Sequence, residues 1–458
     1  MTLSRRGFLG SAALGAGIAG ATRLPGFAAT QLRRPDSRPD PRRPAGTPDP
    51  RIPIEHVVVV MMENHSFDNY FGMLSRRGNP QADGFRFDAH GRPSAVNDTD
   101  KGHPVRSFRM PSYCQMEHEP NQSWNGTHIA VDRGRMDGFV VASGDVAMGY
   151  WDEDDIPFYY SLAKTFPLAN RWFASAPCQT YPNRRFLHAA TAYGLISTTT
   201  PGPSDPPPPN GTIFDRLNAH GLSWFNYFTD LPSTAIIPST VTSNPDKMRP
   251  IAQFYADCAA GTLPNYSLVD PDFGIADVAG GFVPGEALPP TVRAQGQDEE
   301  NPQNIRYGEQ FVAQVVNAVM QSPAWDKTLL VWMYDEHGGY YDHVPPPRAI
   351  KPDNIKPQLG PDDYPGGYDI YGCRVPAVVV SPWARKHHVS NEVHDHTSVL
   401  AFLERKWNLP ALTYRDANAA WMSSFLDFRS AAFKEPPTLV PAPAPVGGRG
   451  CDTTDPNR

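Results

Sequence analysis

The fold is decided by the stretch Ile54-Glu55-His56-Val57-Val58-Val59-Val60-Met61-Met62-Glu63-Asn64-His65-Ser66-Phe67-Asp68-Asn69-Tyr70-Phe71-Gly72. Its first half is a run of apolar, mostly β-branched residues, which predicts a buried strand. Its second half changes abruptly to acids, amides and a hydroxyl, beginning at Glu63 and Asn64. Because ligand sites in open α/β sheets form at the carboxyl ends of the strands, these polar oxygens indicate a functional site.

A second apolar run, residues 327–334, also ends in acids, at Asp335 and Glu336. If both runs are parallel strands, these acids emerge on the same edge of the sheet as Glu63 and Asn64. Three carboxylates and an amide oxygen together suit a hard divalent cation. Without a cation, like charges repel and one carboxylate takes up a proton. The alternative is that the acids cap helix N-termini, where Asp and Glu are favoured.

Strand patterns alternate with helical patterns along most of the chain. We expect strands at 54–62, 223–227, 263–269, 327–334 and 374–380, and helices at 157–166, 184–193, 212–220, 307–320 and 397–406. This alternation predicts an α/β fold, a layered α/β/α sandwich around a largely parallel central sheet. Because no repeat and no clear linker interrupts residues 51–430, we expect this span to form one domain.

Composition limits the classes of protein to be considered. The chain has 458 residues, of which 40% are hydrophobic, enough for a large globular core. The formal net charge of -7 argues against a nucleic-acid partner, because nucleic-acid-binding surfaces are usually basic. The 50 prolines predict long ordered loops around the core, and some belong to loose ends.

The N-terminus carries a targeting pattern. Ser4-Arg5-Arg6-Gly7-Phe8 is a twin-arginine motif, and a mild apolar run follows it, so we predict a cleavable signal peptide over residues 1–28. The alternative, a membrane anchor, is disfavoured because the apolar run is short and rich in Gly and Ala. We expect a disordered Pro-rich linker at 29–50 and a Pro-rich tail at 431–458. Twin-arginine export machinery would deliver the protein outside the cytoplasm: secreted, periplasmic or associated with the cell wall.

The cysteines give no metal signature. The five cysteines, Cys114, Cys178, Cys258, Cys373 and Cys451, lack the close spacing of a zinc–thiolate site. In an exported protein they allow one or two disulfides, and the odd number leaves at least one thiol outside an intramolecular pair. Their spacing does not determine the pairing.

A hydroxyl precedes one of the predicted helices, at Thr180 in the turn Gln179-Thr180-Tyr181-Pro182-Asn183-Arg184. Thr180 suits a helix N-cap, which is the common role of such a threonine. If the turn faces a cation, the same hydroxyl becomes a candidate nucleophile. Arg184 could hold phosphoryl oxygens with two parallel hydrogen bonds, or it could pair with a carboxylate.

Several motifs together resemble a known family. They are, in chain order, Glu63-Asn64-His65-Ser66-Phe67-Asp68-Asn69-Tyr70-Phe71-Gly72, Thr180-Tyr181-Pro182-Asn183-Arg184, Ser322-Pro323-Ala324-Trp325-Asp326-Lys327-Thr328, Asp335-Glu336-His337-Gly338-Gly339-Tyr340-Tyr341-Asp342-His343-Val344-Pro345-Pro346-Pro347 and His396-Thr397-Ser398. This series resembles the phosphoesterase family of non-specific phospholipases C and related acid phosphatases. That family belongs to the alkaline-phosphatase-like superfamily, and the resemblance covers residues 51–430.

The resemblance implies a role for each matching position. The implied metal ligands are Glu63, Asn64, Asp335, Glu336 and Thr180; the implied nucleophile is Thr180; His128, His337 and His396 are candidates for phosphate contact or proton transfer; and Asn183 and Arg184 are candidates for substrate binding. One divalent ion is implied, either Ca, Mg, Mn, Zn or Fe. The mechanism implied is attack by Thr180 on phosphorus, which gives a phosphothreonine that water then hydrolyses.

Two positions depart from the family pattern. Gln122 stands near a place where many members have a histidine, and Glu300-Asn301-Pro302 stands where many have His-Pro. His118 and Asn304 are candidate substitutes for the missing side chains. Because both places would line a phosphate pocket, the departures bear on the substrate rather than on phosphoester chemistry.

Three functions remain open at the level of sequence. The leading one is an exported phospholipase C that acts on phospholipids in transient contact with a membrane surface. The second is an acid phosphatase, a phosphomonoesterase on the same scaffold, acting on a small phosphate ester. The third is a non-catalytic, metal-stabilised binding protein, against which the intact Thr180 and the full set of metal ligands argue.

Overall fold

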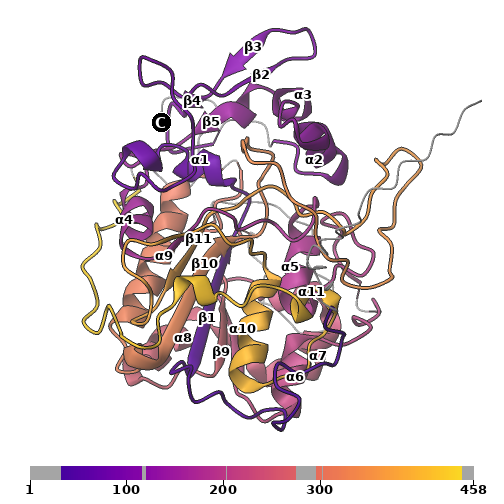
Figure 1. Cartoon of the computed structure of the whole chain (residues 1–458), viewed down its shortest axis with the longest axis vertical. Coiled ribbons are helices and arrows are strands. Elements are labelled where there is room, and N and C mark those ends of the chain that lie inside the picture. Colours follow the sequence, from indigo (N-terminus) through magenta and orange to yellow (C-terminus); the bar gives the residue numbers. More distant parts are fainter. Residues whose placement is uncertain (1–31, 116–119, 203, 275–295, 302, 446–458) are drawn as a thin grey trace, which may run out of the picture. The chain divides into compact units, whose positions relative to one another are not determined.

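A computed structural model describes residues 32–115, 120–202, 204–274, 296–301 and 303–445 (Figure 1). All but Leu32 belong to one compact unit that begins at Arg33. The predicted signal peptide lies outside the described residues, so export stays a prediction. None of the helices within these ranges is long and apolar enough to cross a membrane.

An eight-stranded sheet forms the centre of the unit, in the order β12-β6-β11-β10-β1-β9-β7-β8. The strands are β1 (His56–Met62), β6 (Leu168–Ala169), β7 (Trp224–Phe228), β8 (Met248–Pro250), β9 (Tyr266–Val269), β10 (Thr328–Tyr334), β11 (Ala377–Val380) and β12 (Val389–Ser390). Five of the seven strand pairings are parallel, which confirms the expected α/β fold. The exception is β11, which runs antiparallel to both of its neighbours, β10 and β6.

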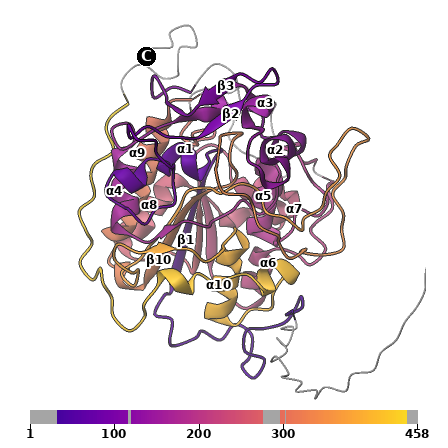
Figure 2. The same cartoon turned by 45° about the horizontal axis from the view of Figure 1, so that its top comes forward.

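Helices cover both faces of this sheet. The described α-helices are α1 (Phe67–Phe71), α2 (Trp124–Val131), α3 (Phe139–Ser143), α4 (Pro157–Thr165), α5 (Thr180–Ala189), α6 (Ile213–Ala219), α7 (Pro238–Ser243), α8 (Ile251–Ala260), α9 (Ile305–Met320), α10 (Thr397–Trp407) and α11 (Tyr414–Ala417). In both views α4, α8 and α9 lie on one side of the sheet, and α5, α6 and α10 lie on the other (Figures 1 and 2). This is the predicted α/β/α sandwich.

Small elements gather beyond the end at which β1 finishes. They are the two-stranded sheets β2 (Val96–Asp98) with β3 (Pro104–Arg106) and β4 (Phe108–Arg109) with β5 (Gly149–Tyr150), together with α2 and α3 (Figure 2). They cover the edge of the sheet where α/β proteins place their sites.

The register of the two central strands places their polar ends at one level. β1 pairs in parallel with β10, and Met62 lies opposite Tyr334. The next residues, Glu63 and Asp335, therefore leave the sheet side by side, as the sequence predicts. From Val57 onward β1 is buried, which is normal for a parallel sheet covered on both faces. β9, the other neighbour of β1, is followed directly by a third acid, Asp270.

The segments on either side of the predicted domain are packed, not loose. Asp36 and Asp40 donate backbone hydrogen bonds to Ala411 O and Asn408 Oδ1, both 2.9 Å long, and the Asn408 amide donates back to Asp40 O. At the other end Phe433 is buried against the core. The expectation of a disordered 29–50 linker and a loose 431–458 tail is therefore wrong for residues 33–50 and 431–445. Composition could not reveal partners so distant in sequence.

The cysteines divide into two groups. Cys114 is disulfide-bonded, whereas Cys178, Cys258 and Cys373 are buried free thiols. Cys451 lies outside the described residues. One disulfide, at Cys114, lies within the range that the sequence allows.

A buried ion cluster holds α1 on the sheet. The Arg374 guanidinium donates from Nε to Asp342 Oδ1 at 2.9 Å and from Nη2 to Asp68 Oδ1 at 3.2 Å. His343 Nδ1 lies 2.6 Å from Asp68 Oδ2, and its Nε2 lies 3.4 Å from Asp83. Burial alone would lower the pKa of His343, but the two aspartates raise it to about 10. Two cations thus offset these carboxylates, so the cluster is an ion-pair centre rather than a metal site.

The protonated His343 predicts a pH-dependent stability. Its folded pKa lies above the unfolded value of about 6.5, so its contribution is fully present below about pH 6.5. That contribution is lost as the pH rises towards 10. We expect His343→Gln to remove roughly 2–4 kcal/mol of this pH dependence. Denaturant unfolding between pH 6 and pH 10 measures it, with the exposed His90→Gln as control. Parallel pH profiles of wild type and His343→Gln would contradict the assignment.

Candidate active site

Asn64 turns the chain away from the end of β1. Its φ of 71° lies in the left-handed region, which asparagine tolerates better than most residues. In this conformation its backbone N–H donates to Asp335 Oδ1 at 3.2 Å. Its side-chain Oδ1 accepts a hydrogen bond from Thr180 Oγ1 at 3.3 Å. Asn64 therefore joins three elements of the site: β1, β10 and the start of α5.

The Asp335 carboxylate accepts hydrogen bonds at both oxygens. Its Oδ1 also accepts from Glu336 N at 2.7 Å, and its Oδ2 accepts from Arg184 Nε at 3.1 Å. Burial raises the pKa of Asp335 well above its usual range, and nearby Glu63 and Glu336 raise it further. Arg184 opposes these effects. A further cation would stabilise the ionised carboxylate, which is the electrostatic condition of a metal site.

The two glycines after Glu336 and His337 are required by close packing. Gly338 and Gly339 have φ of 64° and 77°, and Gly338 N donates to Glu336 Oε2 at 2.8 Å. A Cβ on Gly338 would lie 1.9 Å from the carbonyl oxygen of Asn64. The Gly-Gly pair thus lets the loop after β10 pass against the backbone of Asn64.

Thr180 is the first residue of α5, and Gln179 occupies the N-cap position. The expected helix therefore begins four residues earlier than 184, which is possible because Pro182 lies in the first turn, where no intrahelical donor is needed. Asn183, a predicted substrate-binding residue, is buried within this turn instead. Its Oδ1 accepts from Ala176 N at 3.0 Å, and its Nδ2 donates to Cys178 O at 2.8 Å. Asn183 fixes the turn that presents Thr180.

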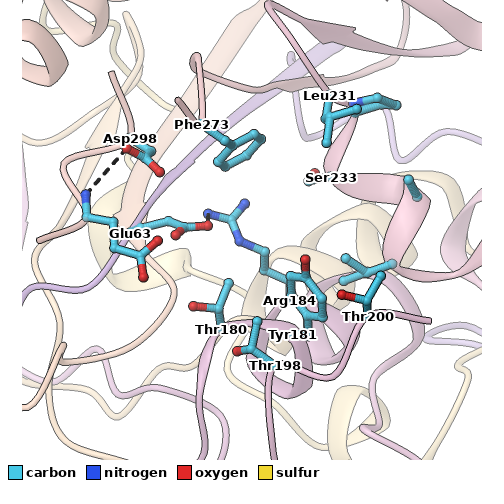
Figure 3. A pocket seen from close by; sticks show the side chains of 14 residues that line it. Glu63, Thr180, Tyr181, Arg184, Thr198, Thr200, Leu231, Ser233, Phe273 and Asp298 are labelled. Atoms are coloured by element: carbon cyan, nitrogen blue, oxygen red, sulfur yellow. Dashed lines mark hydrogen bonds and ion pairs between the residues drawn. The ribbon is translucent and has the colours of Figure 1, made fainter. Parts of the chain in front are cut away.

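A pocket of about 140 Å³ opens beside Thr180 (Figure 3). Its lining combines acids near Thr180 with apolar and hydroxyl side chains; the residues are Glu63, Thr180, Tyr181, Arg184, Thr198, Thr200, Leu231, Pro232, Ser233, Ala235, Ile236, Phe273, Asp298 and Glu300. Carboxylate oxygens of Glu63, Asp298 and Glu300 lie within 4.8 Å of one another. Glu63 N also donates to Asp298 O at 3.0 Å, which ties this segment to the end of β1.

The sequence analysis missed Asp298, and it placed Glu300 beside a phosphate pocket without predicting its grouping with Glu63. The available signal was the run of three acids, Asp298-Glu299-Glu300, before α9. Glu299 anchors this run, because its buried carboxylate accepts from the hydroxyls of three tyrosines, Tyr70, Tyr159 and Tyr334. Burial raises the pKa of Glu299 to about 8, although these hydroxyls lower it.

The three predicted histidines have different surroundings. His396 uses both ring nitrogens inside the protein: Nε2 donates to Asp335 O at 2.7 Å, and Nδ1 accepts from Trp172 Nε1 at 3.4 Å. It therefore supports the Asp335 backbone. His337 Nδ1 lies 3.0 Å from Glu336 Oε2, while its buried Nε2 has no partner among the described residues. Burial lowers the pKa of each to about 4, so both are neutral at pH 7.

His128 lies with a different set of residues. Its Nδ1 lies 2.7 Å from Trp124 O, and its ring stacks on Tyr364 at 5.7 Å between centroids. Among its described contacts, none is with Thr180 or a predicted metal ligand. The structure thus places Thr180 and the four other predicted ligands at one end of the sheet, with His337 and His396 beside Glu336 and Asp335, but not His128. Of the predicted acidic ligands, Glu63 alone belongs to a described group of carboxylates within 4.8 Å of one another, and its partners there are Asp298 and Glu300. Of the two candidate substitutes for the missing histidines, Asn304 is the N-cap of α9, and its Oδ1 accepts from Arg306 N at 3.1 Å. The other, His118, lies outside the described residues.

Comparison with known proteins identifies the family. The sequence model of the Phosphoesterase family matches residues 54–410. The chain belongs to this family. It is therefore a phosphoric ester hydrolase, which argues against the non-catalytic alternative. The match covers the strand, the Thr180 turn and the acidic ends described above.

Relatives of known name are phospholipases C. Non-specific phospholipase C1 of Arabidopsis thaliana is 29% identical over 85% of this chain and 74% of its own length. Non-specific phospholipase C6 of the same plant is 30% identical, over 86% and 76%. Non-hemolytic phospholipase C of Pseudomonas aeruginosa is 28% identical over 89% of this chain and 60% of its own length. A solved alkaline phosphatase superfamily protein from Vibrio parahaemolyticus is 10% identical, with a TM-score of 0.35, over 76% of this chain and 77% of its own.

The donor set suits a hard divalent cation. The site offers carboxylate oxygens, the amide oxygen of Asn64 and the hydroxyl of Thr180, all buried at the ends of two adjacent strands. Burial and the nearby acids raise the pKa of Asp335, so an added positive charge would stabilise its ionised form. Oxygen ligands of this kind suit Ca²⁺, Mg²⁺ or Mn²⁺ by hardness. The acidic cluster that includes Glu63 can therefore bind a metal ion.

Gly338→Ala tests the packing at the centre of the site. The new Cβ would displace the Asn64 carbonyl, so we expect hydrolysis of a nitrophenyl phosphate ester to fall on the order of 100-fold. Gly102→Ala is the matched control, because Gly102 also has a positive φ, 74°, yet no described atom would lie within 4 Å of its Cβ. Equal activity in the two variants would contradict the packing argument.

Proposed function

We propose that the protein is an exported, metal-dependent phospholipase C that cleaves phospholipids to diacylglycerol and a phosphorylated headgroup. The observation that carries the proposal is the Thr180 hydroxyl. It lines the pocket, hydrogen-bonds Asn64 Oδ1 at 3.3 Å and stands beside the acidic ends of β1 and β10. The names of the related phospholipases C support the choice of substrate.

The reaction follows from the position of that hydroxyl. Asn64 would hold and orient Thr180, and the Thr180 oxygen would bond to phosphorus as the bond from phosphorus to the glycerol oxygen breaks. The Thr180 hydroxyl loses its proton as the new bond forms, and the glycerol oxygen takes up a proton, which gives diacylglycerol and a phosphothreonine that carries the headgroup. Water then attacks the phosphorus, restores the hydroxyl and releases the phosphorylated headgroup. A divalent cation, when bound by Glu63, Asn64, Thr180, Asp335 and Glu336, would lower the pKa of the hydroxyl and offset charge on phosphate.

Export is supported by two features. Ser4-Arg5-Arg6-Gly7-Phe8 fits a substrate of the twin-arginine machinery. The disulfide at Cys114 suits an oxidising compartment. A protein placed there would meet phospholipid through transient contact with a membrane surface.

A phosphomonoesterase of the acid phosphatase type is the second candidate. The observation that favours it is the size of the pocket, about 140 Å³, which suits a small phosphate ester. The same Thr180 chemistry serves both reactions, and only the group that leaves phosphorus differs.

Thr180→Ala tests the nucleophile. We expect turnover to fall by at least about 1000-fold while the far-ultraviolet circular dichroism is unchanged, because only the attacking oxygen is lost. Thr180→Ser keeps that oxygen and is expected to retain measurable turnover. Undiminished hydrolysis by Thr180→Ala would contradict the proposed mechanism.

A substrate panel tests the choice between diester and monoester. We expect hydrolysis of phosphatidylcholine and of the nitrophenyl ester of phosphorylcholine, both abolished by EDTA and restored by adding back Mn²⁺ or Ca²⁺. Hydrolysis of nitrophenyl phosphate alone would overturn the phospholipase proposal in favour of the acid phosphatase. Full activity after exhaustive chelation would overturn the metal dependence.

A further inference from the structure

Arg184 lies between two carboxylates that the proposed function assigns to the metal. Its side chain is only 2% exposed, and it extends from α5 to the ends of β1 and β10. Nε donates to Asp335 Oδ2 at 3.1 Å, and Nη2 lies 3.3 Å from Glu63 Oε1. Nη2 also donates to Met61 O at 3.1 Å. A single guanidinium thus holds together the two strand ends that form the site.

These contacts argue against the predicted role of Arg184 in substrate binding. To bind a phosphoryl group with two parallel hydrogen bonds, an arginine directs two N–H donors on one edge of its guanidinium at the ligand. The Nε–Nη2 edge of Arg184 is already used by Asp335, Glu63 and a β1 carbonyl. Arg184 Cζ lies 5.2 Å from the centroid of the ring of Phe273, which also lines the pocket (Figure 3).

The negative charges of Glu63 and Asp335 explain why a buried positive charge is needed between them. Glu63 and Asp335 leave adjacent strands at one level, and both are buried. Two carboxylates brought this close repel each other unless a positive charge lies between them. Arg184 supplies that charge from within the chain.

We propose that Arg184 is the internal counter-ion of the metal site, holding Glu63 and Asp335 together while no divalent cation is bound. This inference rests on the metal dependence in the proposed function. It assigns Arg184 a positioning role: the guanidinium acts through the two carboxylates rather than on the substrate. The chain can then fold with its site assembled before a cation arrives.

The neighbouring arginine provides a matched control. Arg185 belongs to the same helix and is also buried, but it donates to Ile236 O at 3.2 Å and lies 4.3 Å over the ring of Tyr193. Replacing either arginine by methionine removes a buried guanidinium of the same size. Only the replacement of Arg184 leaves Glu63 and Asp335 facing each other without a cation.

Thermal unfolding of the full-length protein tests the proposal, in EDTA and then with added Mn²⁺. In EDTA we expect Arg184→Met to unfold roughly 5–10 °C below Arg185→Met, because it leaves an uncompensated buried charge. Mn²⁺ should recover most of that difference, so the Mn²⁺-induced rise in Tm should be larger for Arg184→Met than for wild type or Arg185→Met. If Mn²⁺ raises the Tm of Arg184→Met no more than that of Arg185→Met, while it still stabilises wild type, the inference about Arg184 is wrong and the proposed metal dependence stands. If Mn²⁺ stabilises no protein, wild type included, the proposed metal dependence and this inference both fail.

A double variant provides a second, independent readout. In EDTA, adding Glu63→Gln to Arg184→Met should raise Tm, because it removes one of the two repelling charges, whereas Glu63→Gln alone should lower it. If Arg184 had a purely structural role, Glu63→Gln would change Tm in the same direction in both backgrounds. That result would overturn the proposal. If Arg184→Met is insoluble, recovery of soluble protein by the double variant supports the proposal, and insolubility of both contradicts it.

Discussion

The site depends on the parallel register of β1 and β10. Met62 lies opposite Tyr334, so the first polar residues after each strand, Glu63 and Asp335, leave the sheet at the same level. A parallel pairing is what makes this possible, because an antiparallel partner would send its acid to the other edge. The left-handed Asn64 and the glycines after Glu336 then turn the two chains towards Thr180.

Burial of charge is the second constraint. The site holds its carboxylates away from water, where an unpaired charge is costly, so each needs donors or a cation. Backbone N–H groups and Arg184 donate hydrogen bonds to the Asp335 carboxylate, and a backbone N–H donates to the Glu336 carboxylate. The negative charge that these donors do not offset would favour binding of a divalent cation beside the Thr180 hydroxyl.

Local patterns predicted the strands, the major helices and the exit of Glu63 and Asp335 from adjacent strand ends, because buried parallel strands have a strong apolar signal. What the sequence alone did not reveal depends on distant contacts. The Asp298–Glu300 segment reaches the site through Glu299 and three tyrosines from separate elements, and residues 33–50 find their partners near residue 410. The direction of β11 and the roles of Asn183, Arg184 and His396 likewise required the packed structure.

The central claim is that Thr180, placed by the ends of β1 and β10, becomes covalently bonded to phosphorus during turnover. Acid quenching of the enzyme during hydrolysis of the nitrophenyl ester of phosphorylcholine, followed by peptide mass spectrometry, tests it most directly. We expect a phosphorylcholine adduct on the peptide that contains Thr180, assigned to that residue and absent from Thr180→Ala. An adduct on a histidine, or turnover with inverted configuration at phosphorus and no adduct at all, would contradict it.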